Sequence, residues 1–127
     1  MFNIICIDWG FKRPGIAFGN LETGLIIPFN GKVENKNLIP TILKEIESRN
    51  IDKIVIGKPL NSRGEKTAVT QNVLDFKNKL ETKIPKNIDI HLQDERWTSK
   101  DGSKLGFSKE DLNHFSAIKI LERYLSK

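Results

Sequence analysis

The sequence has little cysteine and histidine. Cys6 is its single cysteine, and His91 and His114 are its two histidines. One cysteine excludes a disulfide framework, and this composition does not support a cysteine–histidine zinc cluster. We expect Cys6, which lies inside an apolar run, to pack in the core. Neither histidine is assigned a catalytic role: we expect His91 to be structural within a strand and His114 to lie exposed near the start of the last helix.

Segments that would direct the chain to or across a membrane are also lacking. The N-terminus has neither the basic region nor the small-residue cleavage site of a secretory signal. No apolar stretch is long enough to span a bilayer. Repeats, linkers and low-complexity tracts are missing as well, and 127 residues suffice for one hydrophobic core. We therefore predict a single cytoplasmic domain over 1–127, with no membrane partner.

Acidic residues are fewer than basic ones. The chain has 16 Asp and Glu against 21 Lys and Arg, which gives a formal net charge of +5. A basic balance of this size favours a polyanionic partner such as nucleic acid. Hydrophobic residues make up 38% of the chain, and this content excludes a disordered protein.

Hydrophobic patterning predicts an α/β fold. Apolar runs of strand length alternate with segments of helical periodicity after an opening strand meander. The first and fourth runs are apolar almost throughout, which is typical of strands covered on both faces. Pro28 predicts that the third strand lies at a sheet edge or carries a bulge. We expect a five-stranded mixed sheet with helices on both faces, with strands at 3–8, 15–20, 24–33, 52–59 and 88–96, and helices at 37–50, 64–84 and 108–125.

The last predicted helix has recognisable start and packing signals. Ser108 and Asp111 have the spacing of a capping box at its first turn. An apolar stripe then follows at helical spacing, and we expect it to face the sheet. Its members are Leu112, Phe115, Leu121 and Leu125.

Acidic residues follow two of the predicted strands. Asp8 ends the first strand, and Asp94 and Glu95 end the fifth. Sites in α/β sheets gather at the carboxyl ends of parallel strands, so we expect these acids to come from neighbouring strand ends. Carboxylates brought close together repel unless a cation lies between them. Oxygen ligands without a cysteine or histidine cluster favour a hard cation, Mg²⁺ or Mn²⁺.

Basic residues flank the same predicted edge. Lys12 and Arg13 lie in the first turn, Lys58 ends the fourth strand, and Arg96 follows Glu95. Each could contact a phosphate, and Gly10 and Gly15 would let the backbone approach a ligand. A metal flanked by such cations can polarise a phosphodiester and activate a water molecule.

Simpler interpretations of single residues remain open. Asp8 could be a turn residue, and Arg96 could pair with Asp94 at the surface. Trp9 and Trp97 could stack on bases, although their places beside strand ends favour packing at the rim of the core.

Four ordered motifs resemble the YqgF/RuvX family and cover the chain nearly end to end. "IDWGFKRPGIA" resembles the family pattern D-x-G-x-x-R-x-G-x-A, and "IVIGKPLNSRGEKT" resembles "VVGLPLNMDGSE". "QDERWTS" is similar to "DERLTT", and "NHFSAIKILERYL" is similar to the closing "DSxAAxxILxxYL". One such motif alone would be weak evidence, whereas the four in order identify the chain with this family.

The resemblance implies a fold, an activity and a site. The implied fold is RNase H-like, and the implied activity is a metal-dependent nuclease that processes precursor 16S rRNA. Asp8 would be the first acid and Glu95 the second, with Mg²⁺ or Mn²⁺ as cofactor. Asn113 takes the place of the family's third acid, where its carbonyl can coordinate metal more weakly than a carboxylate. Motif positions for substrate contact or support of the acids are Lys12, Arg13, Lys58, Asn61, Arg96 and Thr98.

Two further departures from the family pattern lie outside the acids. Pro14 replaces an apolar residue and stiffens the first turn. The stretch between "ERWTS" and "NHFSA" is also short, with little room for the basic loop and helix that relatives often carry.

Several functional hypotheses remain at this stage. Precursor rRNA is the expected partner of a nuclease, and branched DNA is the partner of a Holliday junction resolvase. A nucleic-acid-binding module that has lost its chemistry is compatible with the net charge and with Asn113. An actin-like or sugar-kinase ATPase would share the D-x-G hairpin but needs a second domain. Both a monomer and a homodimer remain open.

Overall fold

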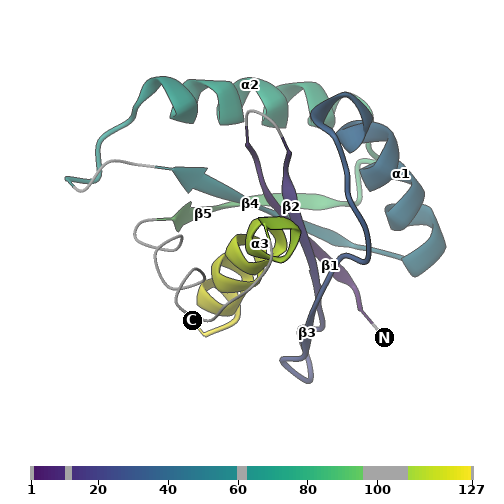
Figure 1. The fold of residues 1–127 in the computed structure, drawn as a ribbon. Coiled ribbons are helices and arrows are strands. Elements are labelled where there is room, and N and C mark those ends of the chain that lie inside the picture. Colours follow the sequence, from purple (N-terminus) through teal and green to yellow (C-terminus); the bar gives the residue numbers. More distant parts are fainter. Residues whose placement is uncertain (1, 11–12, 60–62, 96–108, 127) are drawn as a thin grey trace.

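The computed structural model describes residues 2–10, 13–59, 63–95 and 109–126 (Figure 1). For Glu95 and residues 109–113 it describes the backbone alone. The described part forms a sheet covered by helices on both faces, as the apolar patterning predicts.

Five strands form one mixed sheet in the order β3-β2-β1-β4-β5. β1 is parallel to β4 and β4 is parallel to β5, whereas β2 is antiparallel to β1 and to β3. This confirms the predicted five-stranded mixed sheet. The third strand is shorter than the predicted 24–33, but Pro28 does lie at the sheet edge. The strands are β1 (Ile4–Asp8), β2 (Gly15–Gly19), β3 (Ile26–Pro28), β4 (Lys53–Pro59) and β5 (Asp89–Glu95).

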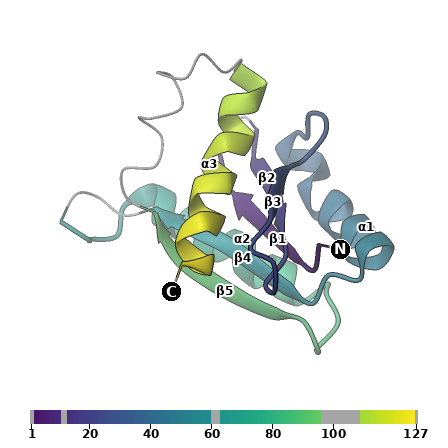
Figure 2. The same ribbon diagram turned by 90° about the horizontal axis from the view of Figure 1, so that it is seen from below.

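Helices α1 (Leu38–Arg49) and α2 (Ala68–Glu81) cover one face of the sheet, and α3 (Lys109–Leu125) crosses the other (Figures 1 and 2). A short 3₁₀ turn, η1 (Asn35–Asn37), leads into α1. Pro40 falls in the first turn of α1, where a missing N–H costs no helical hydrogen bond. Two threonines fix the start of α2: the Thr67 hydroxyl accepts from the Thr70 N–H, and the Thr70 hydroxyl accepts from the Thr67 N–H.

The core has two layers because side chains alternate along each buried strand. In β1, Ile5 and Ile7 pack into the larger layer beneath α1 and α2. Ile4 and Cys6 pack into the smaller layer beneath α3, and Cys6 is fully buried as expected. A strand with no solvent-facing side explains the near-continuous apolar run in the sequence.

Helix α3 lies close to the sheet through a face that shares Leu121 with the predicted stripe and otherwise differs from it. The buried face consists of His114, Ala117, Ile120 and Leu121. Phe115 is instead only partly buried, with the Lys119 ammonium 5.8 Å from its ring centre. Leu125 packs at the margin of the smaller layer. The Leu112 side chain and the predicted Ser108–Asp111 cap lie outside what the structure describes.

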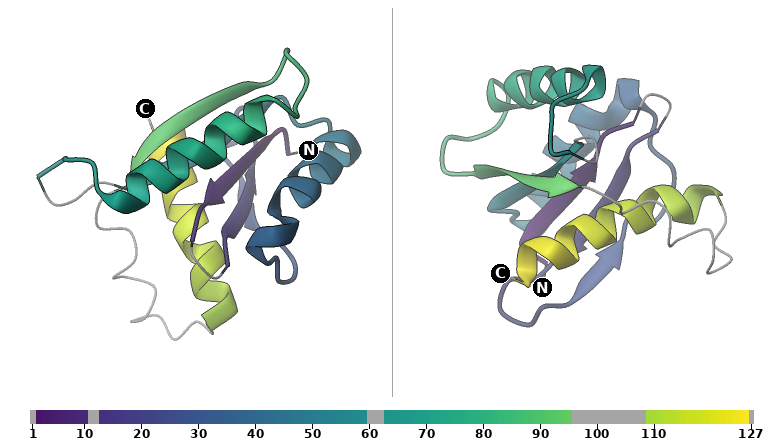
Figure 3. Two further views of the ribbon diagram at one scale, coloured as in Figure 1. Left: turned by 90° about the horizontal axis from the view of Figure 1, so that it is seen from above. Right: turned by 90° about the vertical axis from the view of Figure 1, so that its left-hand side faces the viewer.

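A glycine in β2 permits this close approach. A Cβ atom at Gly19 would lie 2.7 Å from the Leu121 Cδ2 atom, which is closer than two carbon atoms can pack. The helix therefore rests directly on the strand backbone there. Views from above and from one side show α3 crossing the face opposite α2 (Figure 3).

Among the helices described, none combines the length and apolarity that a membrane span requires.

Candidate functional site

Asp8 and Glu95 end two strands that run in the same direction. Asp8 is the last residue of β1, and Glu95 is the last residue of β5, where it pairs in register with Pro59 of β4. Because β1, β4 and β5 are mutually parallel, their carboxyl ends lie at the same edge of the sheet. Open α/β sheets bind ligands at this edge.

The two acids do not come from neighbouring strands. β4 lies between β1 and β5 in the sheet, so the expectation of adjacent strand ends is wrong. Two strand spacings separate the backbones of β1 and β5 by about 9–10 Å. The sequence did not reveal this separation because the strand order depends on long-range pairing. Any ion or phosphate that contacts both acids must therefore span the end of β4.

Asp8 belongs to the α3 side of the sheet. It has the same parity in β1 as Ile4 and Cys6, which pack beneath α3. Extending the β1–β4 register one residue beyond the Ile7–Ile56 pair sets Gly57 opposite Asp8. Gly57 has no side chain, so β4 places no side chain at this position of the α3 face.

Gln93 completes this row of the sheet, although no motif in the sequence predicts a role for it. It pairs with Gly57 in the β4–β5 register and is buried, with 6% of its surface exposed. Its Oε1 atom lies 3.4 Å from the Nε2 atom of His91, the strand residue with the same parity. A buried amide at the strand end that faces Asp8 across a glycine is a candidate support for the acids. Along β5, Gln93 alternates in step with His91 and Glu95, so the three positions belong to one face of the sheet. This period of two is the sequence signal that could have indicated a supporting role for Gln93.

The residues predicted to bind phosphate do not gather on one face of the sheet. Arg13 is exposed in the turn between β1 and β2. Lys58 is partly buried and has the parity of Ile54 and Ile56, which pack beneath α1 and α2. Lys58 therefore belongs to the face opposite Asp8. The other predicted substrate-contact residues fall outside the described part of the chain: Lys12, Asn61, Arg96 and Thr98.

Gly10 fits the turn that follows Asp8. A Cβ atom at this position would lie 2.6 Å from the backbone oxygen of Arg13, a distance that side-chain carbons do not tolerate. The Asn35 side-chain amide donates a hydrogen bond to the Gly10 carbonyl oxygen. Gly10 is therefore required because the backbone of the turn comes back close to this position at Arg13. The same close approach fixes where β1 ends.

His114 anchors the N-terminal half of α3 to the sheet. Its Nδ1 atom accepts a hydrogen bond of 3.0 Å from the Ile16 N–H. Its Nε2 atom lies 2.8 Å from the Gly31 carbonyl oxygen and must donate, because a carbonyl only accepts. The expectation that His114 is exposed is wrong, since 5% of its surface is accessible. His114 lies three residues before the buried Ala117, so the two share one face of the helix. This spacing is the sequence signal that predicts an inward position for His114.

We expect His114→Ala to lower the free energy of unfolding by about 2–4 kcal/mol, because it leaves the buried Ile16 N–H without its acceptor and the Gly31 carbonyl oxygen without its donor. Urea unfolding followed by circular dichroism measures this loss. His91→Ala is the matched control, and its half-buried ring predicts a smaller loss of about 1 kcal/mol. Equal effects of the two substitutions would contradict an anchoring role for His114.

The predicted metal ligands have the right chemistry. Carboxylate and amide oxygens suit Mg²⁺ or Mn²⁺, and Asp8 stands at the edge where α/β sheets bind ligands. Within the described residues there is no group of three or more cysteine, histidine or acidic residues that could hold a metal. The side chains of Glu95 and Asn113 lie outside that description. Asp8, Glu95 and Asn113 therefore stay a predicted ligand set.

Solved structures that align with this chain include resolvases. The fowlpox virus Holliday junction resolvase aligns with a TM-score of 0.59 and 12% identity, covering 97% of both chains. A complex of fowlpox virus resolvase with Holliday junction DNA aligns with the same score, at 13% identity over 99% of this chain and 97% of that one. The chain therefore has the RNase H-like fold of the Holliday junction resolvases.

Sequence comparison then gives the family. The family model described as "RuvX: Holliday junction resolvase" matches residues 2–127. Proteins named "Putative pre-16S rRNA nuclease" from Rickettsia africae and Rickettsia felis are 34% and 36% identical, with 96% of this chain and 84% of each relative aligned. The chain belongs to the RuvX (YqgF) family, as the four motifs predict.

Proposed function

We propose that this protein is a metal-dependent endonuclease that hydrolyses phosphodiester bonds in structured RNA. Its proposed substrate is the 5′ region of precursor 16S rRNA, and its proposed place is the cytoplasm. The observation that carries the proposal is the position of Asp8 and Glu95, which end parallel strands at one edge of the sheet. Family membership supports the same activity, because relatives carry the name of a precursor rRNA nuclease.

Different residues of the chain would have different roles in such a reaction. Asp8, Glu95 and Asn113 would hold Mg²⁺ or Mn²⁺ at the carboxyl edge of the sheet. When bound, the metal supplies a Lewis acid for the phosphate oxygens. Arg13, exposed in the turn after β1, would hold the phosphate backbone through its guanidinium. His114 would fix the part of α3 that carries Asn113 by its two hydrogen bonds to the β2–β3 region.

A comparison of three substrates tests this function. Purified protein is incubated with a precursor 16S rRNA fragment, with mature 16S rRNA of the same region, and with a four-way DNA junction, each in Mg²⁺, Mn²⁺ or EDTA. We expect cleavage of the precursor alone, and only with metal. Cleavage of the junction in preference to RNA would replace the proposal by a DNA resolvase, which the fold of the viral neighbours makes the second candidate. Binding without cleavage would leave a nucleic-acid-binding module.

We expect Asn113→Asp to tighten Mn²⁺ binding by about tenfold or more, because a carboxylate adds a negative ligand where a neutral amide stands. Isothermal titration with Mn²⁺ measures the change. Asn78→Asp, on the exposed surface of α2, adds the same charge away from the site and controls for general electrostatic attraction. Unchanged affinity in Asn113→Asp would show that position 113 lies outside the metal site.

A further inference from the structure

A cavity opens on the face of the sheet opposite Asp8. It has a volume of about 420 Å³ and lies between the start of α1 and the middle of α2. Ligand sites in proteins have volumes of about 300–1,000 Å³, so the cavity is large enough for one aromatic ring system. Its lining includes Trp9, Asn35, Asn72, Asp75, Phe76 and Lys79.

The lining combines flat apolar groups with amides and with one acidic and one basic side chain, Asp75 and Lys79. Trp9 and Phe76 are partly buried against the larger core layer, so they contribute aromatic surface held by packing. Asn72 contributes a side-chain amide, which offers a donor and an acceptor together, whereas the Asn35 amide nitrogen already donates to the Gly10 carbonyl oxygen. Nucleobases have stacking faces and mixed donor–acceptor edges, and proteins bind unpaired bases with aromatic side chains and polar groups of this kind. A purely apolar partner would not match the Asn72 amide.

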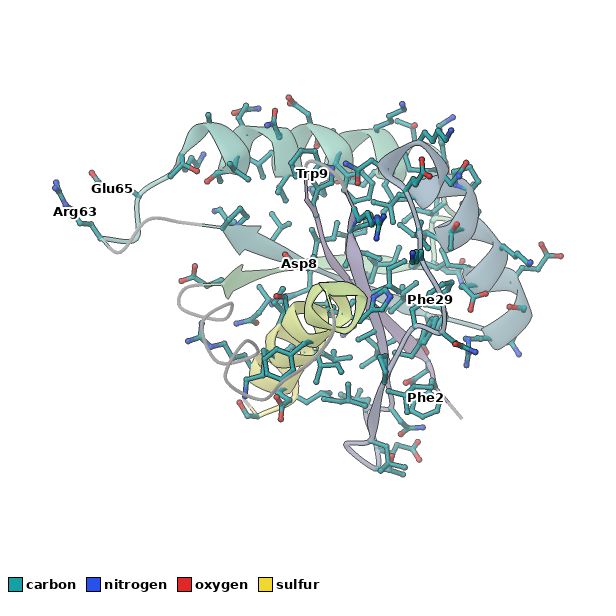
Figure 4. All side chains as sticks on the ribbon, in the orientation of Figure 1. Phe2, Asp8, Trp9, Phe29, Arg63 and Glu65 are labelled. Carbon is teal, nitrogen blue, oxygen red and sulfur yellow. The ribbon has the colours of Figure 1, made fainter. Side chains whose placement is uncertain are left out.

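The cavity is close to the proposed reaction site along the chain. Trp9 directly follows Asp8, and the two residues belong to opposite faces of the sheet end (Figure 4). Lys58 has the parity of the cavity face, and Lys79 lines the cavity itself. A nucleic-acid strand with a phosphate at Asp8 can therefore pass around the end of the sheet. Its next phosphate would meet a lysine and its next base an aromatic cavity.

We propose that this cavity binds one unpaired nucleobase of the substrate, beside the scissile phosphate. The inference rests on the proposed nuclease function for the identity of the strand, and it adds a specific role for the face that carries Trp9. The substrate would be a structured RNA whose cleavage point has at least one nucleotide outside a helix. Cleavage would then depend on that base, besides the phosphates.

Tryptophan fluorescence tests the proposal without any need for cleavage. The chain has two tryptophans, so Trp97→Phe leaves Trp9 as the only emitter. This variant is titrated in EDTA with a short unpaired RNA, the same RNA with one abasic position, and a DNA of the same sequence. We expect quenching by the RNA and at least tenfold weaker quenching when the critical base is removed. Equal quenching by DNA would show that the base, rather than the ribose, is recognised.

Variants of the lining separate base binding from packing. Asn72→Ala is expected to weaken RNA binding about fivefold or more, because an amide facing the base is lost. Asn78→Ala is the matched control on the same helix, since it is exposed and does not line the cavity. Trp9→Phe should keep most of the affinity, whereas Trp9→Ala should lose about tenfold or more. Melting temperatures are measured for each variant, because Trp9 also packs against the core.

The outcomes distinguish this inference from the nuclease function. Cleavage of RNA with no Trp9 quenching, and with equal activity in Asn72→Ala and Asn78→Ala, would overturn the base site and leave the nuclease standing. Base-dependent quenching in a protein that cuts no substrate would keep the base site and overturn the nuclease. Quenching that is the same with and without the abasic position would overturn the base site as well.

Discussion

We expect Asp8→Asn to abolish metal-dependent cleavage while the protein stays folded. Asp8 is the acid at the end of the central strand β1, on the side of the sheet that α3 covers. An Asn side chain has nearly the same volume but no negative charge, so it binds a divalent cation more weakly. We expect the cleavage rate to fall by at least about a thousandfold, which corresponds to about 4 kcal/mol of lost transition-state stabilisation.

Single-turnover cleavage of the precursor RNA measures this loss, with RNA binding measured separately by fluorescence anisotropy. Asp52→Asn is a matched control, because Asp52 is exposed at the opposite, amino end of β4. We expect the control to cut at the normal rate. If Asp8→Asn retains most of the activity, Asp8 is a turn residue and the proposed site is wrong. A large fall in melting temperature would instead make its role structural.

Much of the fold follows from local features of the sequence. The apolar runs at β1 and β4 predict strands covered on both sides, and two layers of core do cover them. Pro28 indicates an edge strand because proline cannot donate to a central ladder, and β3 does lie at the edge. These features could be predicted because strand period, proline chemistry and helix periodicity act over a few neighbouring residues.

The arrangement of the candidate site depended on pairings that the sequence does not state. Asp8 and Glu95 were expected at neighbouring strand ends, but the strand order inserts β4 between them. Lys58 was grouped with Asp8, yet its parity in β4 belongs to the other face. The place of His114 near the start of the last helix predicts an exposed side chain, whereas two backbone groups of the β2–β3 region satisfy its ring. Register and hydrogen-bond partners of this kind are long-range properties.

Glu95→Gln is expected to reduce cleavage by at least about a hundredfold, with little change in stability. The position ends β5 at the same edge as Asp8, and its parity is that of His91 and Gln93 on the α3 face. Removal of one of two acids halves the negative charge available to a cation, and a hundredfold corresponds to about 2.7 kcal/mol. Cleavage measured over a range of Mn²⁺ concentrations should show partial recovery at high metal, because weakened binding is overcome by mass action.

The neighbouring acid provides a strict control for that prediction. Asp94 precedes Glu95 in β5, pairs in register with Lys58, and has the parity of Ile90 and Leu92 on the face beneath α2. If the α3 face carries the chemistry, Asp94→Asn must leave the metal dependence of cleavage unchanged while Glu95→Gln shifts it. The reverse result would place the second acid on the α2 face. The two substitutions are at adjacent positions of β5, and these positions belong to opposite faces of the sheet. Comparing them therefore decides which face of the sheet end binds the metal.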